Sequence, residues 1–191
     1  MWDEMYQKGN VAWGHIPATF LQEIIDKIPN KSRILDLGCG AGRNSKLLFD
    51  KGHTVTGIDS SIVAIEQARE FCNATFLQED LITNDWIDQK FDVVLDFGFL
   101  HSWPKEEKLL EYRYQLDNVL EIGGLYVGEQ SKTNLRKDPL GGSLYAPPYM
   151  EEKEFMIFGG YKEIIFRNNT LPPHDGWGIY PCYQMLLERV K

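Results

Sequence analysis

The run from Ile34 to Gly42, Ile-Leu-Asp-Leu-Gly-Cys-Gly-Ala-Gly, constrains the fold more than any other part of this chain. It has the pattern of a buried strand that leads into three alternating glycines, with a carboxylate, Asp36, near the end of the strand. Gly38 and Gly40 allow a tight turn and close approach of a ligand, and the amides that open the next helix point outward as donors. The run therefore predicts a cofactor site at the end of a strand.

The spacing of the glycines argues against a dinucleotide site. A dinucleotide fingerprint reads G-x-G-x-x-G, and counting from Gly38 its third glycine would fall at position 43, which is Arg43. An NAD-dependent oxidoreductase is therefore a distant alternative.

Strand and helix patterns alternate along the chain, as in βαβ units with a mostly parallel sheet covered on both faces. Two segments, 131–150 and the stretch around 172–177, have the Pro and Gly pairs of long loops. Strands are expected at 33–37, 54–58, 75–78, 91–97, 125–130, 161–167 and 182–190, and helices at 17–28, 42–51, 61–72, 105–120 and 151–158.

Charge and composition narrow the class of partner. The net charge of −8 disfavours nucleic acid or an anionic membrane, because such binding depends on Lys and Arg at phosphates. We therefore expect a small-molecule partner, and a cytoplasmic location because the N-terminus lacks a secretory pattern. The three cysteines share no C-x-x-C spacing, so neither a disulfide framework nor a metal site is expected. The oligomeric state, monomer or dimer, stays open.

A second carboxylate follows the glycine loop at a useful distance. Asp59, at the end of the next strand and followed by Ser60, stands 17 residues after Gly42. A carboxylate there can accept both hydroxyls of a ribose, or alternatively cap the helix that starts near Ser61.

Three further motifs follow in order, and together with the glycine loop they give the chain a recognisable pattern. They are Gln78-Glu79-Asp80-Leu81, Phe91 to Phe97 with its following turn, and Leu120-Glu121-Ile122-Gly123-Gly124. The series over residues 31–130 resembles class I S-adenosylmethionine-dependent methyltransferases, with Ile122 in place of a family proline. The resemblance implies a three-layer Rossmann-like α/β fold, with a seven-stranded, mostly parallel sheet and an antiparallel C-terminal strand.

The resemblance also implies how the cofactor is held. The loop with Asp36, Gly38, Cys39 and Gly40 would lie beneath the methionine part, and Asp59 with Ser60 would hold the ribose. Asp80, or Glu79 in its place, would accept the adenine amino group, and Leu81 would pack on the ring. Backbone around Asp96 and Phe97 would hold the methionine ammonium group.

The N-terminal run that includes Trp2, Tyr6, Trp13 and Gly14 resembles a small-molecule branch of that family, which includes thiopurine, thiol and tellurite-resistance methyltransferases. The resemblance implies an N-terminal segment that closes over the cofactor, with Trp13 against the sulfonium or the adenine. A terminal helix that merely docks on the core is the alternative. Residues 1–191 would then form one domain: 1–30 covering the cofactor, 31–130 binding it, and 131–191 carrying substrate loops and the final strands.

Three residues are candidates for catalysis, each with a simpler alternative. His101 follows the fourth expected strand and can serve as a base or merely enter the next helix. His174 lies in the second long loop and is followed by Asp175, where tellurite-resistance enzymes carry an Arg. Asp96 can orient the acceptor or bond the turn backbone.

The chain is expected to methylate a small molecule, with a thiol or other soft nucleophile favoured. Methylation of a metabolite at oxygen or nitrogen, or a non-catalytic cofactor-binding module, are the alternatives.

Overall fold

The computed structural model describes residues 2–7, 14–80, 89–100, 106–132, 152–171 and 180–191. Their centre is one seven-stranded sheet in the order β3-β2-β1-β4-β5-β7-β6. The strands are β1 (Arg33–Leu37), β2 (Thr54–Asp59), β3 (Thr75–Gln78), β4 (Phe91–Phe97), β5 (Leu120–Ser131), β6 (Tyr161–Leu171) and β7 (Tyr180–Arg189).

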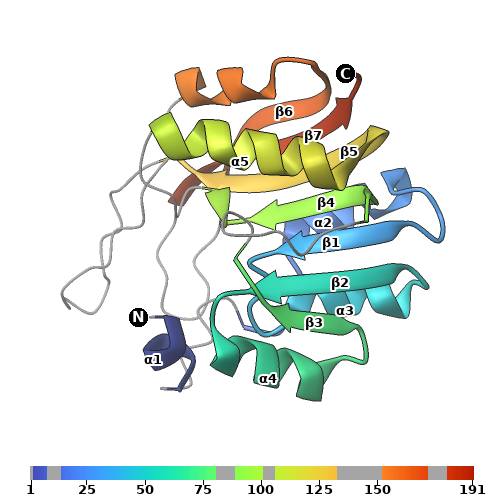
Figure 1. Ribbon diagram of the computed structural model, residues 1–191, viewed down its shortest axis with the longest axis vertical. Coiled ribbons are helices and arrows are strands. Elements are labelled where there is room, and N and C mark those ends of the chain that lie inside the picture. Colours follow the sequence, from blue (N-terminus) through green and yellow to red (C-terminus); the bar gives the residue numbers. More distant parts are fainter. Residues whose placement is uncertain (1, 8–13, 81–88, 101–105, 133–151, 172–179) are drawn as a thin grey trace.

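Strands β1 to β5 are parallel, and β7 pairs antiparallel with both β5 and β6. The expected sheet, mostly parallel with an antiparallel C-terminal strand, is therefore confirmed. In Figure 1 the arrowheads of β1, β2 and β4 point to one edge of the sheet, where the N-terminal helix α1 (Trp2–Gln7) also lies. In parallel α/β sheets, ligands bind outside this carboxyl edge.

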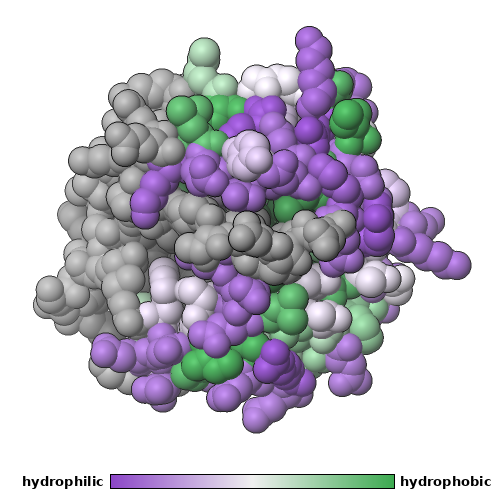
Figure 2. All heavy atoms as spheres, viewed as in Figure 1, coloured by the Kyte–Doolittle hydropathy of each residue, from purple (hydrophilic) through white to green (hydrophobic). Residues whose placement is uncertain are grey.

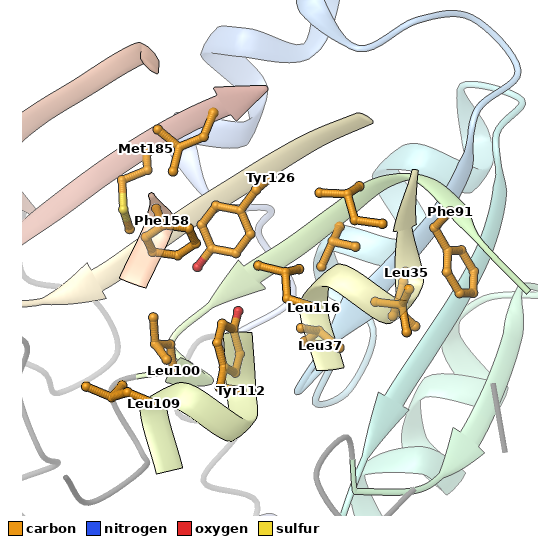
Figure 3. Close-up of a cluster of buried hydrophobic side chains, with 14 of the residues drawn as sticks. Leu35, Leu37, Phe91, Leu100, Leu109, Tyr112, Leu116, Tyr126, Phe158 and Met185 are labelled. Atoms are coloured by element: carbon orange, nitrogen blue, oxygen red, sulfur yellow. The ribbon is translucent and has the colours of Figure 1, made fainter. Parts of the chain in front are cut away.

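Helices cover both faces of the sheet. Apolar side chains of α2 (Thr19–Ile24) and α3 (Arg43–Asp50) share one core cluster with alternate residues of β1, β2, β4, β5 and β7. The opposite faces of these strands pack on α5 (Glu106–Val119) and the 3-10 helix η4 (Glu152–Phe158). Figure 3 shows this second cluster, with Tyr112 of α5 and Tyr126 of β5 turning their hydroxyl groups toward one another. Helix α4 (Ile62–Phe71) packs beside β3 through a third, smaller cluster.

Several boundaries differ from the sequence expectations. β6 runs to Leu171 and not to Arg167, and β7 starts at Tyr180 and not at Cys182. The fifth strand starts at Leu120 and not at Leu125, and its glycine pair lies inside the strand. Phe91 pairs with Leu120 whereas Val93 pairs with Leu125, so a bulge absorbs the extra residues and Gly123 takes a φ of 83°. The expected helix over 17–28 is shorter and ends in a 3-10 turn, η1 (Ile25–Lys27).

The described surface is mostly polar. In the view of Figure 2, apolar side chains occur as small separate groups among hydrophilic ones. Among the described residues, no helix has the length and apolar character needed to span a membrane.

Candidate functional site

A cavity of about 260 Å³ opens at the carboxyl edge of the sheet. Its walls come from the glycine loop after β1, the ends of β2 and β3, the turn after β4 and helix α1. The described residues that line it are Trp2, Tyr6, Gly14, Asp36, Gly38, Cys39, Gly40, Ala41, Arg43, Asn44, Asp59, Ser60, Glu79, Asp80, Phe97, Gly98 and Phe99.

The glycine loop presents bare backbone to this cavity. Gly38 and Gly40 have φ angles of 62° and 54°, in the left-handed region that favours glycine. An added Cβ at Gly40 would lie 2.5 Å from the hydroxyl oxygen of Tyr6. Gly42 follows at the N-cap of α3, with a φ of 84°. The loop therefore needs glycine both for its conformation and for the space above it.

Asp59, at the end of β2, joins the glycine loop to helix α4. Its carboxylate accepts hydrogen bonds from the backbone amides of Gly40, at 3.0 Å, and Ser61, at 2.9 Å. Burial raises the pKa of Asp59, and these two bonds oppose the rise. The cap of α4 is Ser61, whose hydroxyl accepts from the amide of Ala64 at 3.2 Å. Asp59 is thus free of the capping role, and each carboxylate oxygen retains a lone pair.

Asp36 is a second buried carboxylate in the cavity wall. Burial raises its pKa to about 6, against the effects of a 2.6 Å hydrogen bond from Ser45 Oγ and the positive charge of Arg43. The charges of Asp59 and Asp96 add to the rise. The wall is therefore acidic, which favours a cationic ligand.

Asp96 holds the turn after β4 in place. Its Oδ1 accepts from the backbone amides of Phe99 and Leu100, at 2.9 and 3.1 Å. Tyr112 Oη donates to Oδ2 at 2.6 Å, and Gln130 Nε2 donates to Oδ1 at 2.7 Å. The residue is 0% exposed, and both of its carboxylate oxygens are engaged by these bonds. This geometry favours the turn-bonding alternative for Asp96 over direct orientation of an acceptor.

Helix α1 lies over the site and is fastened to α4. Asp3 Oδ1 accepts from Ser61 Oγ at 2.5 Å, and the backbone oxygen of Tyr6 accepts from Gln67 Nε2 at 3.3 Å. The Tyr6 side chain lines the cavity, where burial, and then the charges of Asp59 and Cys39, raise its pKa. Helix α1 therefore forms part of the cavity wall at this edge.

The structure gathers most of the expected cofactor residues around one cavity. Cys39 is buried against Ala68 and Phe76, and burial keeps the pKa of its thiol well above the usual range, which suits packing and not nucleophilic attack. Trp13, Leu81, His101 and His174 lie outside the described residues. Those placed in the cavity wall are Asp36, Gly38, Cys39, Gly40, Asp59, Ser60, Asp80 and Phe97.

Several cavity residues were missed by the sequence analysis. Arg43 is the one positively charged side chain among the described residues of the wall, and Asn44 accepts a bond from the amide of Ala18 at 2.9 Å. Their position, directly after the third glycine at the start of α3, was an available signal. Gly98 and Phe99 belong to the turn that Asp96 holds.

This arrangement defines the class of protein: an α/β fold with a cavity built on the glycine loop after β1 and the acid after β2. Residues 28–153 match the family model of the methyltransferase domain. The chain belongs to this methyltransferase domain family.

The curated relatives act on different kinds of acceptor. The human eEF1A lysine and N-terminal methyltransferase is 32% identical over 142 residues, which cover 66% of this chain and 20% of that protein. The arsenite methyltransferase of Rattus norvegicus is 33% identical over 144 residues, covering 59% of this chain and 38% of the relative. The chain thus spans well under half the length of either relative.

Solved structures share the fold at lower identity. A methyltransferase from Methanosarcina mazei superposes with a TM-score of 0.76 at 22% identity, covering 87% of this chain and 97% of that one. TehB from Haemophilus influenzae superposes with a TM-score of 0.71 at 17% identity, covering 98% and 67%.

Proposed function

We propose that this protein is an S-adenosylmethionine-dependent methyltransferase and that it acts on a small molecule held beside the turn after β4. One observation carries the proposal: α1 closes part of the cavity, because Trp2 and Tyr6 line it together with the glycine loop and the turn residues Phe97 and Phe99. A partly closed cavity suits a small acceptor, since a pocket of this kind encloses most of its ligand. The net charge of −8 also disfavours a nucleic-acid substrate.

The cavity residues fit the cofactor. Gly38 and Gly40 offer backbone where a side chain would intrude, and Asp59 retains acceptor capacity for the two ribose hydroxyls. Asp80, or Glu79 beside it, is proposed to accept the adenine amino group. Cys39, Ser60 and Phe97 complete the wall, and Trp13 and Leu81 remain proposed contacts outside the described residues.

Charges in the wall suit the two ends of the methionine part. Asp36 is proposed to favour the ammonium group, and Arg43 to pair with the carboxylate. S-adenosylmethionine supplies a methyl group on a positively charged sulfonium. Around it, Trp2 and Tyr6 exclude water, and the turn fixed by Asp96 positions Phe97 and Phe99. Such alignment can contribute up to about 7–11 kcal/mol in well-oriented reactions.

The acceptor atom is the finer part of the proposal. A thiol or other soft nucleophile needs little acid–base help, and the relative named for arsenite is consistent with one. Nitrogen or oxygen acceptors need a group that takes a proton, for which His101 and His174 stay candidates. A protein substrate is the second candidate, favoured by the relative named for lysine and N-terminal methylation.

Two measurements test the proposal in sequence. Calorimetry should show S-adenosylhomocysteine bound to the wild type and bound about 10- to 100-fold more weakly to Asp59→Ala, because the ribose hydroxyls lose a charged partner. Asp50→Asn, on the exposed side of α3, is the matched control and should bind as the wild type does. Release of S-adenosylhomocysteine with small thiols, alcohols or amines, and not with proteins or peptides, would support the small-molecule assignment. The reverse result would overturn it.

A further inference from the structure

A row of polar side chains crosses the second half of the sheet on the α2 face, and we call it the polar row. It consists of Glu129 on β5, Gln184 on β7, Arg167 on β6 and Glu23 on α2. Glu129 pairs with Gln184, and Gln184 with Arg167, in adjacent strands. Gln184 Nε2 donates to Glu129 Oε2 at 2.7 Å, and Arg167 Nη1 donates to Glu23 Oε1 at 3.0 Å.

The orientation of the Gln184 amide is fixed by chemistry. Arg167 Nε donates to Gln184 Oε1 at 2.9 Å, and an arginine side chain has no acceptor. The oxygen of the amide must therefore face Arg167, which turns the amide nitrogen toward Glu129. Asn169 Nδ2 adds a second bond to the same oxygen at 3.0 Å. The Gln184 amide cannot flip, so its nitrogen always donates to Glu129.

Glu129 is largely buried, but its Oε1 is not one of the fully enclosed polar atoms of the described residues. It is 8% exposed, and among the described residues its Oε1 has no hydrogen-bond partner. Arg167, the arginine of the row, donates its hydrogen bonds to Gln184 and Glu23. Burial raises the pKa of Glu129, against the bond from Gln184 and the positive charges of Arg43 and Arg167. A buried carboxylate with one neutral donor is costly for stability alone, which marks it as a candidate functional group.

The position of Glu129 connects it to the cavity. It pairs with Phe97, the last residue of β4, and paired residues of adjacent strands point to the same face. Phe97 lines the cavity next to the turn that Asp96 holds. Glu129 therefore lies one strand beyond the cavity wall, on the side away from the ribose acid Asp59.

We propose that Glu129 selects the methyl acceptor by accepting a hydrogen bond from its N–H group through Oε1. This inference rests on the proposed function and names its substrate class: a small amine. A fixed carboxylate accepts a hydrogen bond from a neutral N–H-bearing nitrogen, whose lone pair stays available for the methyl group, and it repels a thiolate because like charges disfavour one another. The methylated product is an ammonium ion, which releases its proton to water. The inference therefore favours a nitrogen acceptor over the soft nucleophile expected from the resemblance.

The test compares matched acceptors with matched variants. Amines and thiols on the same carbon frames, such as benzylamine and phenylmethanethiol, are assayed by S-adenosylhomocysteine release and by binding to the S-adenosylhomocysteine complex. Glu129→Gln keeps the shape of the side chain and removes its charge, and Glu129→Asp keeps the charge. Glu188→Gln, at an exposed ion pair with Lys162, is the control for charge alone.

We expect Glu129→Gln to raise KM and Kd for amines by about 10- to 100-fold and to leave the values for thiols unchanged. Glu129→Asp should restore part of the amine preference, and Glu188→Gln should change neither. A purely structural role would lower turnover of both acceptor classes alike, and that result would overturn the proposal. It is also overturned if no amine binds or reacts while S-adenosylhomocysteine still binds. If the wild type did not bind S-adenosylhomocysteine, that result would instead contradict the proposed function.

Discussion

The two halves of the sheet build their polar sites in different ways. In the β1–β3 half, Asp59 is bonded by backbone amides, and the glycine loop offers its own backbone to the cavity. In the β5–β7 half, Glu129 is bonded by a side chain that is itself oriented by another side chain. In the proposed function, the first half holds the cofactor, whereas the second half contacts the acceptor. Backbone sites constrain sequence locally, and side-chain networks depend on residues far apart in the chain.

Asp96 lies where the two halves join, and its removal should have the largest effect. Asp96→Ala leaves Tyr112, Gln130 and two turn amides without their acceptor, which should lower the free energy of unfolding by about 3–5 kcal/mol. Asp96→Asn can keep Oδ1 for the amides and Gln130 while its nitrogen faces the Tyr112 oxygen. Urea unfolding should therefore show a much smaller loss for Asp96→Asn. Equal losses would contradict the assigned role of Asp96 in the turn.

The pH dependence of stability tests the role of Asp36, which lies on β1 in the β1–β3 half. Its folded-state pKa of about 6 lies above the ordinary value of 3.8, so its ionisation costs folding free energy. The cost is absent below pH 3.8, accumulates as pH rises to about 6, and reaches ~3 kcal/mol above that. Asp36→Asn should therefore be more stable than the wild type at neutral pH, with no such gain in acid.

The same variant should bind the cofactor less well. The affinity of the wild type for S-adenosylmethionine should fall as pH drops through about 6, because the ammonium group favours the ionised carboxylate. Asp36→Asn should lose this pH dependence. Calorimetry at several pH values, with chemical unfolding in the same buffers, measures both effects. If the variant kept the pH profile of the wild type, Asp36 would not be the group that favours the ammonium of the cofactor.

Two glycine variants distinguish the cost of backbone strain from the cost of a side chain that blocks the ligand. Gly40→Ala and Gly52→Ala both place a side chain at positive φ, with angles of 54° and 87°, and each should cost about 1–2 kcal/mol of stability. An added Cβ at Gly52 meets nothing within 4 Å, whereas at Gly40 it meets the Tyr6 hydroxyl. Only Gly40→Ala should therefore lose S-adenosylhomocysteine binding in calorimetry. Equal binding by both variants would show that the loop tolerates a side chain under the ligand.

This difference between halves also explains what the sequence could predict. The alternation of strands and helices indicated the sheet, and the glycine loop with Asp59 and Asp80 indicated residues that the structure gathers at one cavity. These signals are local, since each is a short motif at the end of a strand. The bulge in β5 was missed because a glycine pair after a helix looks like a turn, and only pairing with β4 shows that the strand has already begun.

The polar row was missed for a different reason. Glu129 follows Leu125 and Val127 on one face of β5, so it interrupts an apolar face, which was the only local signal. Gln184, which bonds Glu129, lies 55 residues further along the chain. Arg167, which orients Gln184, lies 38 residues after Glu129 on yet another strand. No spacing rule links such residues before the strand order β5-β7-β6 is known.

The outer end of the polar row should be the least sensitive position. Glu23 is 49% exposed in its side chain, and its ion pair with Arg167 at the surface should contribute only about 0.2–1 kcal/mol, less at high salt. Glu23→Gln should therefore shift the urea midpoint slightly and leave acceptor preference unchanged, because Arg167 still stacks on Phe20 and still donates to Gln184. If Glu23→Gln altered the ratio of amine to thiol methylation as Glu129→Gln is expected to, the ion pair would orient the whole row. Selection would then belong to the network and not to its buried carboxylate.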